Sequence, residues 1–232
     1  MKKKILILGG SSDIGKELAK LFLKNTNCKI DLHYCSNLKI SEKIKNNLNF
    51  IRADFLDTNF ENTLKKFNDD YDIIINLIGY ISIKTFEKFT IDSFEKTLRV
   101  NSLIPLLIIK KSIKKMIKKK WGRILNTSSV GVNFGGGFNT FEYAASKHFN
   151  EFIPKYFRDL AKKNIFYNVL KIGLTDTKLH KKIPFKNIRN RAKLLPTKKI
   201  AKPKDIADYI YFLTLNKNNF ITNELINITG GE

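Results

Sequence analysis

Three residues of this chain, Ser129, Tyr143 and Lys147, have the types and the spacing needed to move a proton. Tyr143 and Lys147 are four positions apart in a segment with helical periodicity, which places both side chains on one helix face. A free tyrosine has a pKa near ~10, and a cation about 4 Å away lowers that value by roughly the amount needed for neutral pH. A Tyr–Lys pair at this spacing is often only a solvated pair, so its meaning depends on where the fold places it together with Ser129.

A glycine-rich turn near the start of the chain suggests a second kind of chemistry, the binding of a phosphate. The residues from Gly9 to Gly15 read GGSSDIG; they follow an apolar run at 4–8 and open a helical pattern at 13–24. Glycines let the backbone approach a pyrophosphate, and a helix start offers free N–H donors. The turn can equally be an ordinary one with a Ser or Asp helix cap. Its place after the first strand favours dinucleotide binding.

The rest of the chain alternates between strand and helix patterns, which predicts an α/β fold with helices on both faces of a parallel sheet. We expect one domain, residues 1–232, with a doubly wound seven-stranded parallel sheet. Its carboxyl edge would bring Ser129, Tyr143 and Lys147 into one crevice. The predicted strands are 4–8, 29–34, 49–52, 72–77, 123–127, 165–172 and 224–228, and the predicted helices are 13–24, 38–47, 91–119 with a kink at Pro105, 141–163 and 203–215.

One late segment, residues 178–200, is dense in Lys and Arg and has little regular periodicity. It lies between the sixth predicted strand and the last predicted helix. We therefore expect a surface lobe on the substrate side of the ligand site and not a second domain.

Taken in order, the residues that carry these patterns resemble those of the short-chain dehydrogenase/reductase family over essentially the whole chain. The resemblance implies a Rossmann fold that binds NAD(P), and an oxidoreductase that interconverts a carbonyl and a secondary alcohol by hydride transfer. Within the family, the chain resembles 3-oxoacyl-[acyl-carrier-protein] reductases. The matching residues are Gly9 to Gly15, Asp54, Asn76 to Gly79, Asn101, Ser129, Tyr143, Lys147, Gly173 to Thr177, and Gly230 with Gly231.

The resemblance also implies a role for each matching residue. Tyr143 exchanges a proton with the substrate oxygen, and Ser129 hydrogen-bonds that oxygen. Lys147 holds the nicotinamide ribose and lowers the pKa of Tyr143, and Asn101 supports a water-linked proton relay to Lys147. No metal is implied. The cofactor-binding residues that it implies are Gly9, Ser11, Ser12, Asp13, Ile14, Gly15, Ser36, Asn37, Asp54, Phe55, Asn76, Gly79, Lys147, Gly173, Thr175 and Thr177.

Two departures from the family pattern bear on these roles. Asp13 stands where the family usually has its middle glycine, and we expect it to be tolerated because a carboxylate near a helix start suits the helix dipole. The gap between Ser129 and Tyr143 is one residue longer than usual, which makes Ser128 a neighbouring candidate for the role of Ser129. We favour Ser129 because a Val-Gly pair follows it, as in relatives.

The segment after the second predicted strand bears on the choice of cofactor. An acid there would bind the ribose 2′-hydroxyl and select NAD, but residues 33–39 contain no acid. Ser36, Asn37 and Lys39 could accommodate a 2′-phosphate, so NADP is favoured over NAD. The alternative is that Lys39 merely begins a solvated helix.

The formal net charge of +22 admits two interpretations. It could reflect an anionic substrate or partner, or the composition bias of AT-rich codons, which gives many Lys, Asn, Ile and Phe; we take the bias as its main cause. Nucleic-acid recognition usually recruits Arg, which is scarce here, so we expect no nucleic-acid partner.

No apolar stretch approaches the ~20 residues of a membrane span. With only Cys28 and Cys35 as thiols, we expect a cytoplasmic protein without disulfides.

Three functions remain open. The first is reduction of 3-oxoacyl chains on an acyl carrier protein, which the basic segments 118–123 and 178–200 could dock. The alternative is a sugar or nucleotide-sugar oxidoreductase, and the third is a cofactor-bound regulatory protein without catalysis. The intact Ser129, Tyr143 and Lys147 argue against the third. We also expect a homodimer or homotetramer, paired through helices 91–119 and 141–163.

Overall fold

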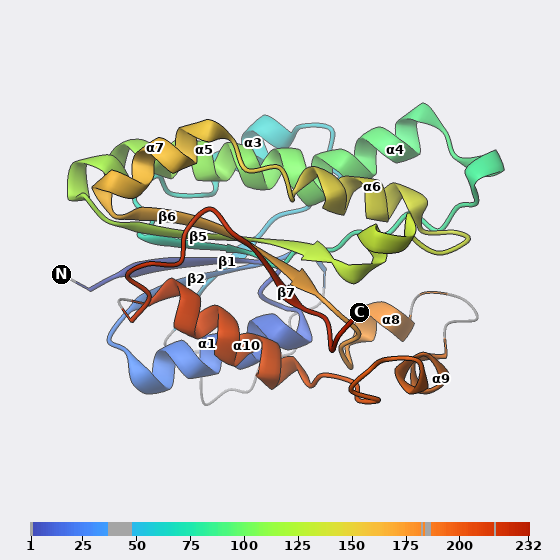
Figure 1. The fold of residues 1–232 in the computed structure, drawn as a ribbon. Helices are drawn as coiled ribbons and strands as arrows, with labels where there is room; N and C mark the ends of the chain where they lie inside the picture. Colours follow the sequence, from blue (N-terminus) through green and yellow to red (C-terminus); the bar gives the residue numbers. More distant parts are fainter. Residues whose placement is uncertain (1, 37–47, 182, 184–186, 216) are drawn as a thin grey trace.

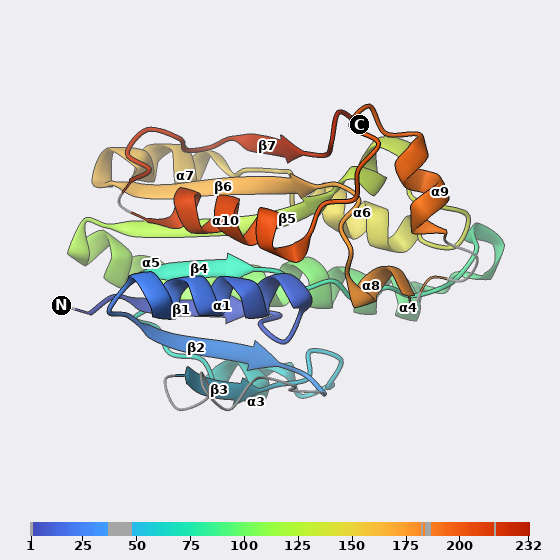
Figure 2. The same cartoon turned by 90° about the horizontal axis from the view of Figure 1, so that it is seen from below.

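The computed structural model describes residues 2–36, 48–181, 183, 187–215 and 217–232. The helix predicted at 38–47, with Asn37 and Lys39, lies outside the described residues. The described strands form one parallel sheet in the order β3-β2-β1-β4-β5-β6-β7 (Figure 2), which confirms the predicted fold class. The strands are β1 (Lys4–Leu8), β2 (Lys29–Tyr34), β3 (Leu48–Arg52), β4 (Ile73–Asn76), β5 (Gly122–Ser129), β6 (Ile165–Ile172) and β7 (Leu225–Ile228).

Alternate side chains of the central strands build a separate hydrophobic core on each face of the sheet. In β1, Ile5 and Ile7 join the core under α1 (Asp13–Asn25) and α10 (Pro203–Thr214), while Leu6 and Leu8 join the opposite core. Because both faces are covered, β1 and β4 are apolar over nearly their whole length and do not alternate. On the second face lie α3 (Phe60–Lys65), α4 (Ile91–Leu98), α5 (Ile104–Lys119), α6 (Phe141–Phe149) and α7 (Lys155–Leu160) (Figure 1).

The order of the strands determines where a ligand can bind. The chain moves outward from β1 to β2 and β3, then returns to place β4 on the other side of β1. Open α/β sheets bind ligands beside the carboxyl ends of strands at such a switch point. The turns after β1, β4 and β5 meet there, and with the ends of these strands they carry the predicted residues from Gly9 to Gly15, Asn76, Gly79 and Ser129.

The helix predicted at 91–119 is nearly continuous, and its kink has an identifiable origin. A π-helical turn, Arg99–Leu103, joins α4 to α5, with Pro105 in the first turn of α5. Pro105 lacks the N–H that would bond the Asn101 carbonyl four residues back. That carbonyl instead accepts the side-chain amides of Asn150 at 3.2 Å and Asn76 at 3.4 Å. Pro105 thus frees a backbone acceptor beside the cleft.

The single helix predicted at 141–163 is wrong. The segment forms α6 and α7, separated by an irregular stretch that ends at Pro154, the residue preceding α7. Proline disfavours helical conformation in the residue before it and cannot donate a helical hydrogen bond. The apolar periodicity continues through the break, which is why periodicity alone did not reveal it.

The described residues of 174–200, which we call the lobe, overhang the carboxyl edge of the sheet (Figure 2). They include α8 (Lys178–Lys181) and α9 (Ile188–Lys193), two short helices that the sequence patterns did not predict. The lobe has a small apolar cluster of its own, built on Leu174, Ala192 and Leu195. Gly231 lets the chain after β7 pass beside it, since an added Cβ would lie 2.8 Å from the ring of Pro196.

Two further observations concern membrane spans and metal sites. Among the described residues, no helix is both long and apolar enough to cross a membrane. In the same part of the chain, no three His, Cys, Asp or Glu side chains gather where they could hold a metal ion.

Candidate active site

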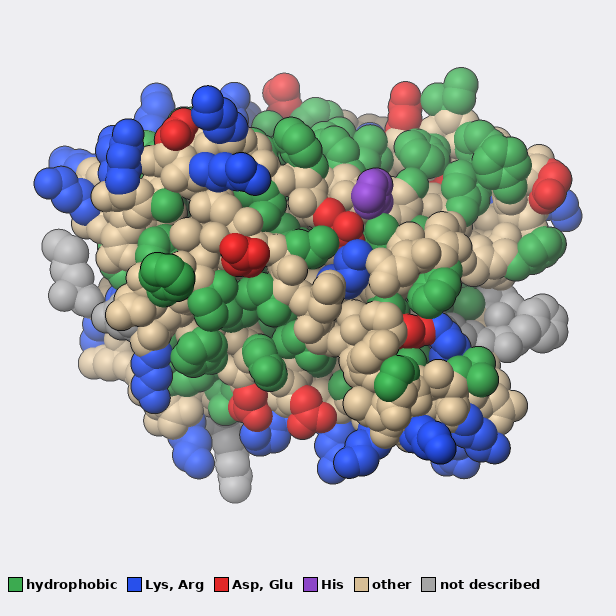
Figure 3. Space-filling model, viewed as in Figure 1, with side chains coloured by type: hydrophobic (Ala, Val, Ile, Leu, Met, Phe, Trp, Pro, Cys, Tyr) green, Lys and Arg blue, Asp and Glu red, His purple; other side chains and the backbone are tan. Residues whose placement is uncertain are grey.

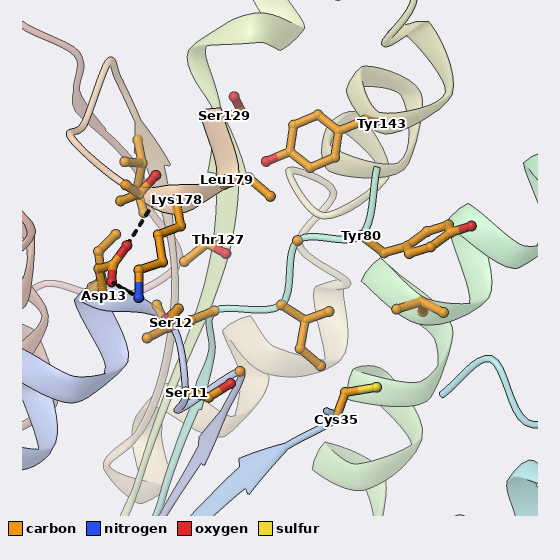
Figure 4. A pocket seen from close by; sticks show the side chains of 18 of the residues that line it. Ser11, Ser12, Asp13, Cys35, Tyr80, Thr127, Ser129, Tyr143, Lys178 and Leu179 are labelled. Atoms are coloured by element: carbon orange, nitrogen blue, oxygen red, sulfur yellow. Dashed lines mark hydrogen bonds and ion pairs between the residues drawn. The ribbon is translucent and has the colours of Figure 1, made fainter. Parts of the chain in front are cut away.

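Two cavities meet at the carboxyl edge of the sheet. The first, of about 430 Å³, runs from the glycine-rich turn to Tyr143 and Lys147. The second, of about 610 Å³, lies between the loop after β5 and the lobe. Ser129 and Tyr143 line both cavities, as do Gly173, Leu179 and His180. A molecule in either cavity therefore reaches the same two hydroxyl groups (Figure 4).

Lys147 lies in α6 under the first cavity and is only 2% exposed. Its ammonium group donates hydrogen bonds to neutral acceptors: the carbonyl of Ile78 at 2.7 Å, and the carbonyl and hydroxyl of Thr127 at 3.1 and 3.2 Å. Burial lowers the pKa of Lys147 to about 7, because removal from water disfavours the charged form. The amine is thus held in a defined position, and it gains or loses its proton near neutral pH.

Tyr143 stands one helical turn before Lys147, whose amine is 5.9 Å from the centroid of the tyrosine ring. Burial raises the pKa of Tyr143 to about 12, against a hydrogen bond from Ser129 that lowers it. We expected Lys147 to lower this pKa, but desolvation outweighs every favourable contact among the described residues. The protein alone therefore holds Tyr143 as a neutral phenol, the form that can donate a proton.

The structure separates the two candidate serines at the end of β5. The hydroxyl of Ser128 donates to the carboxylate of Glu151 at 2.6 Å, and that carboxylate also pairs with Lys171 at 3.0 Å. Ser129 instead accepts from the backbone N–H of Gly131 and hydrogen-bonds with Tyr143. Ser129 is thus the serine whose hydroxyl faces the tyrosine, as the sequence favoured.

Asn101 and Asn76 lie behind the first cavity and do not line it. The Asn101 side chain donates to the Tyr80 carbonyl at 2.9 Å and accepts from the Tyr80 N–H at 2.7 Å. Asn76 is completely buried, donates to Asn126 at 2.7 Å and accepts from the Ile78 N–H at 3.1 Å. Both amides are therefore engaged in fixing the loop after β4. Asn76, expected among the cofactor contacts, is placed where it supports that loop.

The glycine-rich turn is packed tightly against its surroundings. Gly9 has φ +71°, and a Cβ at Gly15 would lie 2.7 Å from the backbone of Gly10. Gly15 is therefore set behind the turn and lines no part of the cavity, whereas Gly9, Ser11, Ser12, Asp13 and Ile14 do line it. Ser12 caps α1 by accepting the Gly15 N–H at 3.1 Å.

Asp13 connects this turn to the lobe. Its carboxylate accepts the backbone N–H of Lys178, at the start of α8, at 2.8 Å, and the Lys178 ammonium is 4.0 Å away (Figure 4). The sequence predicted a tolerated substitution beside a helix dipole. The structure adds a contact between residues 165 positions apart, the one hydrogen bond here that joins the turn to α8 among the described residues.

The outer end of the first cavity is lined by residues after β2 and β3. Cys35 and Ser36 follow β2, and Asp54 and Phe55 follow β3. The remaining residues expected at the cofactor, Gly79, Gly173, Thr175 and Thr177, also line this cavity.

The residues of the first cavity fit a dinucleotide. Its volume falls in the range of small-molecule sites. One end is the start of a helix, where backbone N–H groups attract phosphate. The other end holds Lys147, which can exchange one of its present neutral acceptors for a ribose hydroxyl. Gly79 lies beside the phenol, since a Cβ there would be in ordinary van der Waals contact with the Tyr143 ring at 3.8 Å.

Sequence reasoning missed several lining residues of this cavity, and two of them, His33 and Thr127, make polar contacts that shape it. Thr127 supplies two of the three acceptors that hold Lys147. Its place in β5 two residues before Ser129 is a usable signal, since residues i and i+2 share one face of a strand. His33 lies within β2 beside the glycine-rich turn, where its polar type among apolar neighbours marks it out.

Comparisons with known proteins agree with this geometry. A family model described as Enoyl-(Acyl carrier protein) reductase matches residues 12–232. The chain is 29% identical over 246 residues to a 3-oxoacyl-[acyl-carrier-protein] reductase of Buchnera aphidicola subsp. Baizongia pistaciae, covering 99% of this chain and 97% of that protein. It is 28% identical to the solved structure of a short chain dehydrogenase family protein from Francisella tularensis subsp. tularensis, with TM-score 0.83, covering 100% and 98% of the chains. The structure of ElxO with NADP bound matches at 28% identity and TM-score 0.79, with the same coverage.

Proposed function

The chain belongs to the short-chain dehydrogenase/reductase family of oxidoreductases, and we propose that it reduces the keto group of a 3-oxoacyl chain on an acyl carrier, with NADPH as cofactor. The observation that carries the proposal is that Ser129 and Tyr143 line both cavities. The cofactor side and the substrate side of the cleft then meet at two hydroxyl groups.

In this proposal each residue of the cleft has one task. NADPH, when bound, supplies the hydride. Tyr143 gives its proton to the carbonyl oxygen, and Ser129 hydrogen-bonds that oxygen and fixes its position. Lys147 holds the ribose and stabilises the phenolate that forms when Tyr143 gives up its proton. Asn101 contributes its backbone carbonyl, which accepts the side-chain amide of Asn150 in place of a helical N–H, to the path by which a proton returns.

The preference for NADPH has two supports. The described residues after β2 that line the cavity, Cys35 and Ser36, carry no acid that would repel a 2′-phosphate. A relative that is 28% identical over the whole chain, ElxO, has been solved with NADP bound.

The second cavity favours an acyl chain over a sugar. Most of its lining side chains are apolar, and a sugar would leave its hydroxyls without partners there. Two of the polar lining side chains, Arg191 and Glu232, pair with each other; the other polar ones are Ser129, Asn139, Thr140, Tyr143 and His180. The apolar lining residues are Ile81, Val130, Phe134, Phe138, Ala144, Leu174, Leu179 and Ile183.

A carrier would dock on the lobe and not on segment 118–123. That segment lies at the amino end of β5, across the sheet from the cleft, and Arg123 is buried between the rings of Trp121 and Phe166. Basic side chains occur on several edges of the surface (Figure 3), which agrees with a compositional origin for most of the charge. The cations of the lobe are those beside the cleft, including Lys178, Arg189 and Lys193.

The proposal includes a homodimer or homotetramer. Helices α6 and α7, the stretch between them and the turn before α5 carry exposed apolar side chains: Leu103, Phe149, Phe152 and Tyr156. An apolar face of this kind is typical of subunit interfaces. Light scattering on the wild type should show at least a dimer at micromolar concentration, and Phe152→Ser should weaken it; a monomer in both would contradict this part of the proposal.

The proposal also places the protein in the cytoplasm. Neither Cys28 nor Cys35 forms a disulfide, and Cys35 is exposed. A reducing compartment is where exposed thiols persist.

The test of the proposed function is turnover of an acetoacetyl group on a purified acyl carrier, followed by loss of NADPH absorbance. We expect turnover with NADPH, weaker turnover with NADH, and a reversal of this preference in Ser36→Asp. Turnover of a nucleotide sugar but of no 3-oxoacyl thioester would overturn the substrate, and tighter binding of NADH by the wild type would overturn the cofactor.

A further inference from the structure

His33 contacts the glycine-rich turn at one end of the first cavity, and no role has yet been given to it. It lies in β2, is 4% exposed and lines the first cavity. Its Nδ1 accepts the backbone N–H of Gly9 at 3.1 Å, and its own backbone carbonyl accepts the N–H of Gly10 at 2.8 Å. On the other side of the ring, Nε2 is 3.0 Å from the carbonyl of Ala53.

The partners of the ring determine its protonation state. A backbone N–H can only donate and a carbonyl can only accept. His33 must therefore be neutral, with its hydrogen on Nε2. A proton on Nδ1 would point at the N–H of Gly9 and break that contact. Burial lowers the pKa of His33 to about 4, which keeps the ring neutral at physiological pH, although the carboxylate of Asp54 acts weakly in the opposite direction.

The elements packed around the ring reinforce this arrangement. Phe55 is stacked on it with centroids 4.6 Å apart, and Phe67 lies across it at 5.8 Å. Asp54 is the charged group that acts on the ring, and it lines the same cavity. The imidazole therefore has one position and one orientation, fixed by apolar contacts on its faces and hydrogen bonds at its edges.

We propose that His33 is a positioning residue for the cofactor, joining the turn that faces the pyrophosphate to the residues after β3 that face the adenine. Through Gly9 and Gly10 it holds the turn, and through Ala53 it holds the backbone next to Asp54 and Phe55. The inference rests on the proposed function, because it assumes that a dinucleotide occupies this cavity. Since His33 is remote from Tyr143, it should set cofactor affinity and leave the chemical step unchanged.

Two substitutions separate the two hydrogen bonds of the ring. The side-chain oxygen of Asn can take the place of Nδ1, so His33→Asn retains an acceptor for Gly9 and loses the link to Ala53. The amide of Gln can reach the place of Nε2, so His33→Gln retains the link to Ala53 and leaves the N–H of Gly9 without its acceptor. Tyr71→Phe is the matched control: it removes a buried hydrogen bond to Asp31, two residues before His33 in β2, and neither Tyr71 nor Asp31 lines the first cavity.

The expected results depend on whether a variant keeps the acceptor for the Gly9 N–H, because Gly9 belongs to the turn that faces the pyrophosphate. His33→Gln should raise the Kd for NADPH about five- to tenfold, the worth of one hydrogen bond, while kcat at saturating NADPH stays within about twofold. His33→Asn keeps the acceptor for Gly9 and loses only the link to Ala53, so it should raise the Kd by no more than about two- to threefold, as a partial rescue by the conservative variant. Tyr71→Phe should lower the melting temperature without moving the Kd. Equal Kd values for wild type and His33→Gln, or a fall in kcat in place of a rise in Kd, would overturn the inference.

A second readout does not depend on any cofactor. The chain has three histidines, so ¹⁵N labelling of histidine gives few side-chain signals in an NMR spectrum, and loss of one set in His33→Asn assigns His33. We expect the hydrogen on Nε2, and Nδ1 as a hydrogen-bond acceptor, from neutral pH down to about pH 5. A proton on Nδ1 in this range would contradict the inference even if NADPH binds. Failure of the wild type to bind any dinucleotide while this tautomer is observed would instead refute the proposed function.

Discussion

We call Lys147, Asn101 and the ends of β4 and β5 around them the floor of the cleft. The floor is held in place mainly by side-chain hydrogen bonds, and the lobe above it mainly by apolar and backbone contacts. In the floor, Lys147 makes three hydrogen bonds to β4 and β5 neighbours, and Asn101 is held by the backbone of Tyr80 on both sides of its amide. The lobe rests on three buried apolar residues and a few backbone contacts, such as Ala201 N–H to the Leu174 carbonyl at 3.0 Å. One polar contact, from Lys178 to Asp13, ties α8 to the glycine-rich turn.

This difference teaches which part of the site carries the chemistry and which part selects the substrate. A proton donor must be held within a fraction of an ångström of its target, and the dense contacts of the floor provide that. An apolar pocket wall needs shape more than fixed polar atoms, and the described part of the lobe is held mainly by apolar and backbone contacts. Substitutions in the floor should therefore affect rate strongly, and those in the lobe should affect substrate and cofactor binding mildly.

The largest expected effect is that of Lys147→Ala in the floor. The variant loses the charge that stabilises a phenolate on Tyr143 and the donor that holds the ribose. We expect kcat to fall by a factor of roughly 10² to 10⁴ and the Kd for NADPH to rise together with it. Steady-state kinetics and fluorescence titration measure the two effects.

Lys111→Ala is the matched control for this experiment. Lys111 also donates to two backbone carbonyls, those of Leu64 at 2.9 Å and Phe67 at 2.7 Å, but on α5, outside the cleft. It should leave both kcat and Kd unchanged. If Lys147→Ala also left kcat and Kd unchanged, the claim that the floor of the cleft carries the chemistry would be wrong.

The next effect concerns stability and pH. The pKa of His33 is about 4 in the folded protein against 6.5 for the free side chain. As pH falls through 6.5 the unfolded chain takes up the proton first, so stability is lost between pH 6.5 and 4, by about 3 kcal/mol in all. His33→Asn has no such group. Urea unfolding of both proteins across this range should therefore show a difference in stability that shrinks in acid; parallel curves would show that His33 does not stay neutral on folding.

A smaller effect is expected where the two regions touch, at Asp13. Asp13→Ala removes the acceptor for the Lys178 N–H, whereas Asp13→Asn retains an acceptor and removes only the charge. We expect NADPH to dissociate about threefold faster from Asp13→Ala and at nearly the wild-type rate from Asp13→Asn. Stopped-flow displacement measures both rates. Equal rates in all three proteins would mean that the contact does not hold the lobe over the cofactor.

The smallest effect is that of salt on the lobe. Exposed charges are screened beyond about 8 Å at physiological ionic strength. If the lobe cations attract a carrier, the KM for a carrier-bound substrate should rise about two- to threefold from low to physiological salt. The KM for the same acyl group on a small thiol should stay flat. Identical salt dependence for the two substrates would assign the charge of the lobe to composition alone.

The same contrast explains what could be predicted from the sequence. Ser129, Tyr143 and Lys147 were recognised because each needs its own chemical type, and the structure places all three at the first cavity. The strands followed from apolar runs, and β1, β2 and β6 have the predicted bounds. The break at Pro154 was missed because apolar periodicity continues through it.

The parts that could not be predicted depend on contacts between distant segments. Asp13 was assigned to the helix dipole, and only the fold shows that the N–H of Lys178 reaches it. His33 contacts backbone groups of Gly9 and Ala53. Every residue has such groups, so the residue types at these positions do not reveal the contacts. The expected lowering of the Tyr143 pKa failed because charge was weighed and desolvation was not.

The most direct test of the account is a single-turnover reduction by Tyr143→Phe, preloaded with NADPH and mixed with a 3-oxoacyl thioester that the wild type reduces. The substitution keeps the ring and removes only the hydroxyl that both cavities share. The account predicts unchanged NADPH affinity and melting temperature, with a rate lower by a factor of roughly 10² to 10⁴, the worth of a positioned proton donor. A rate near that of the wild type would contradict it, because the carbonyl oxygen would then take its proton from another group.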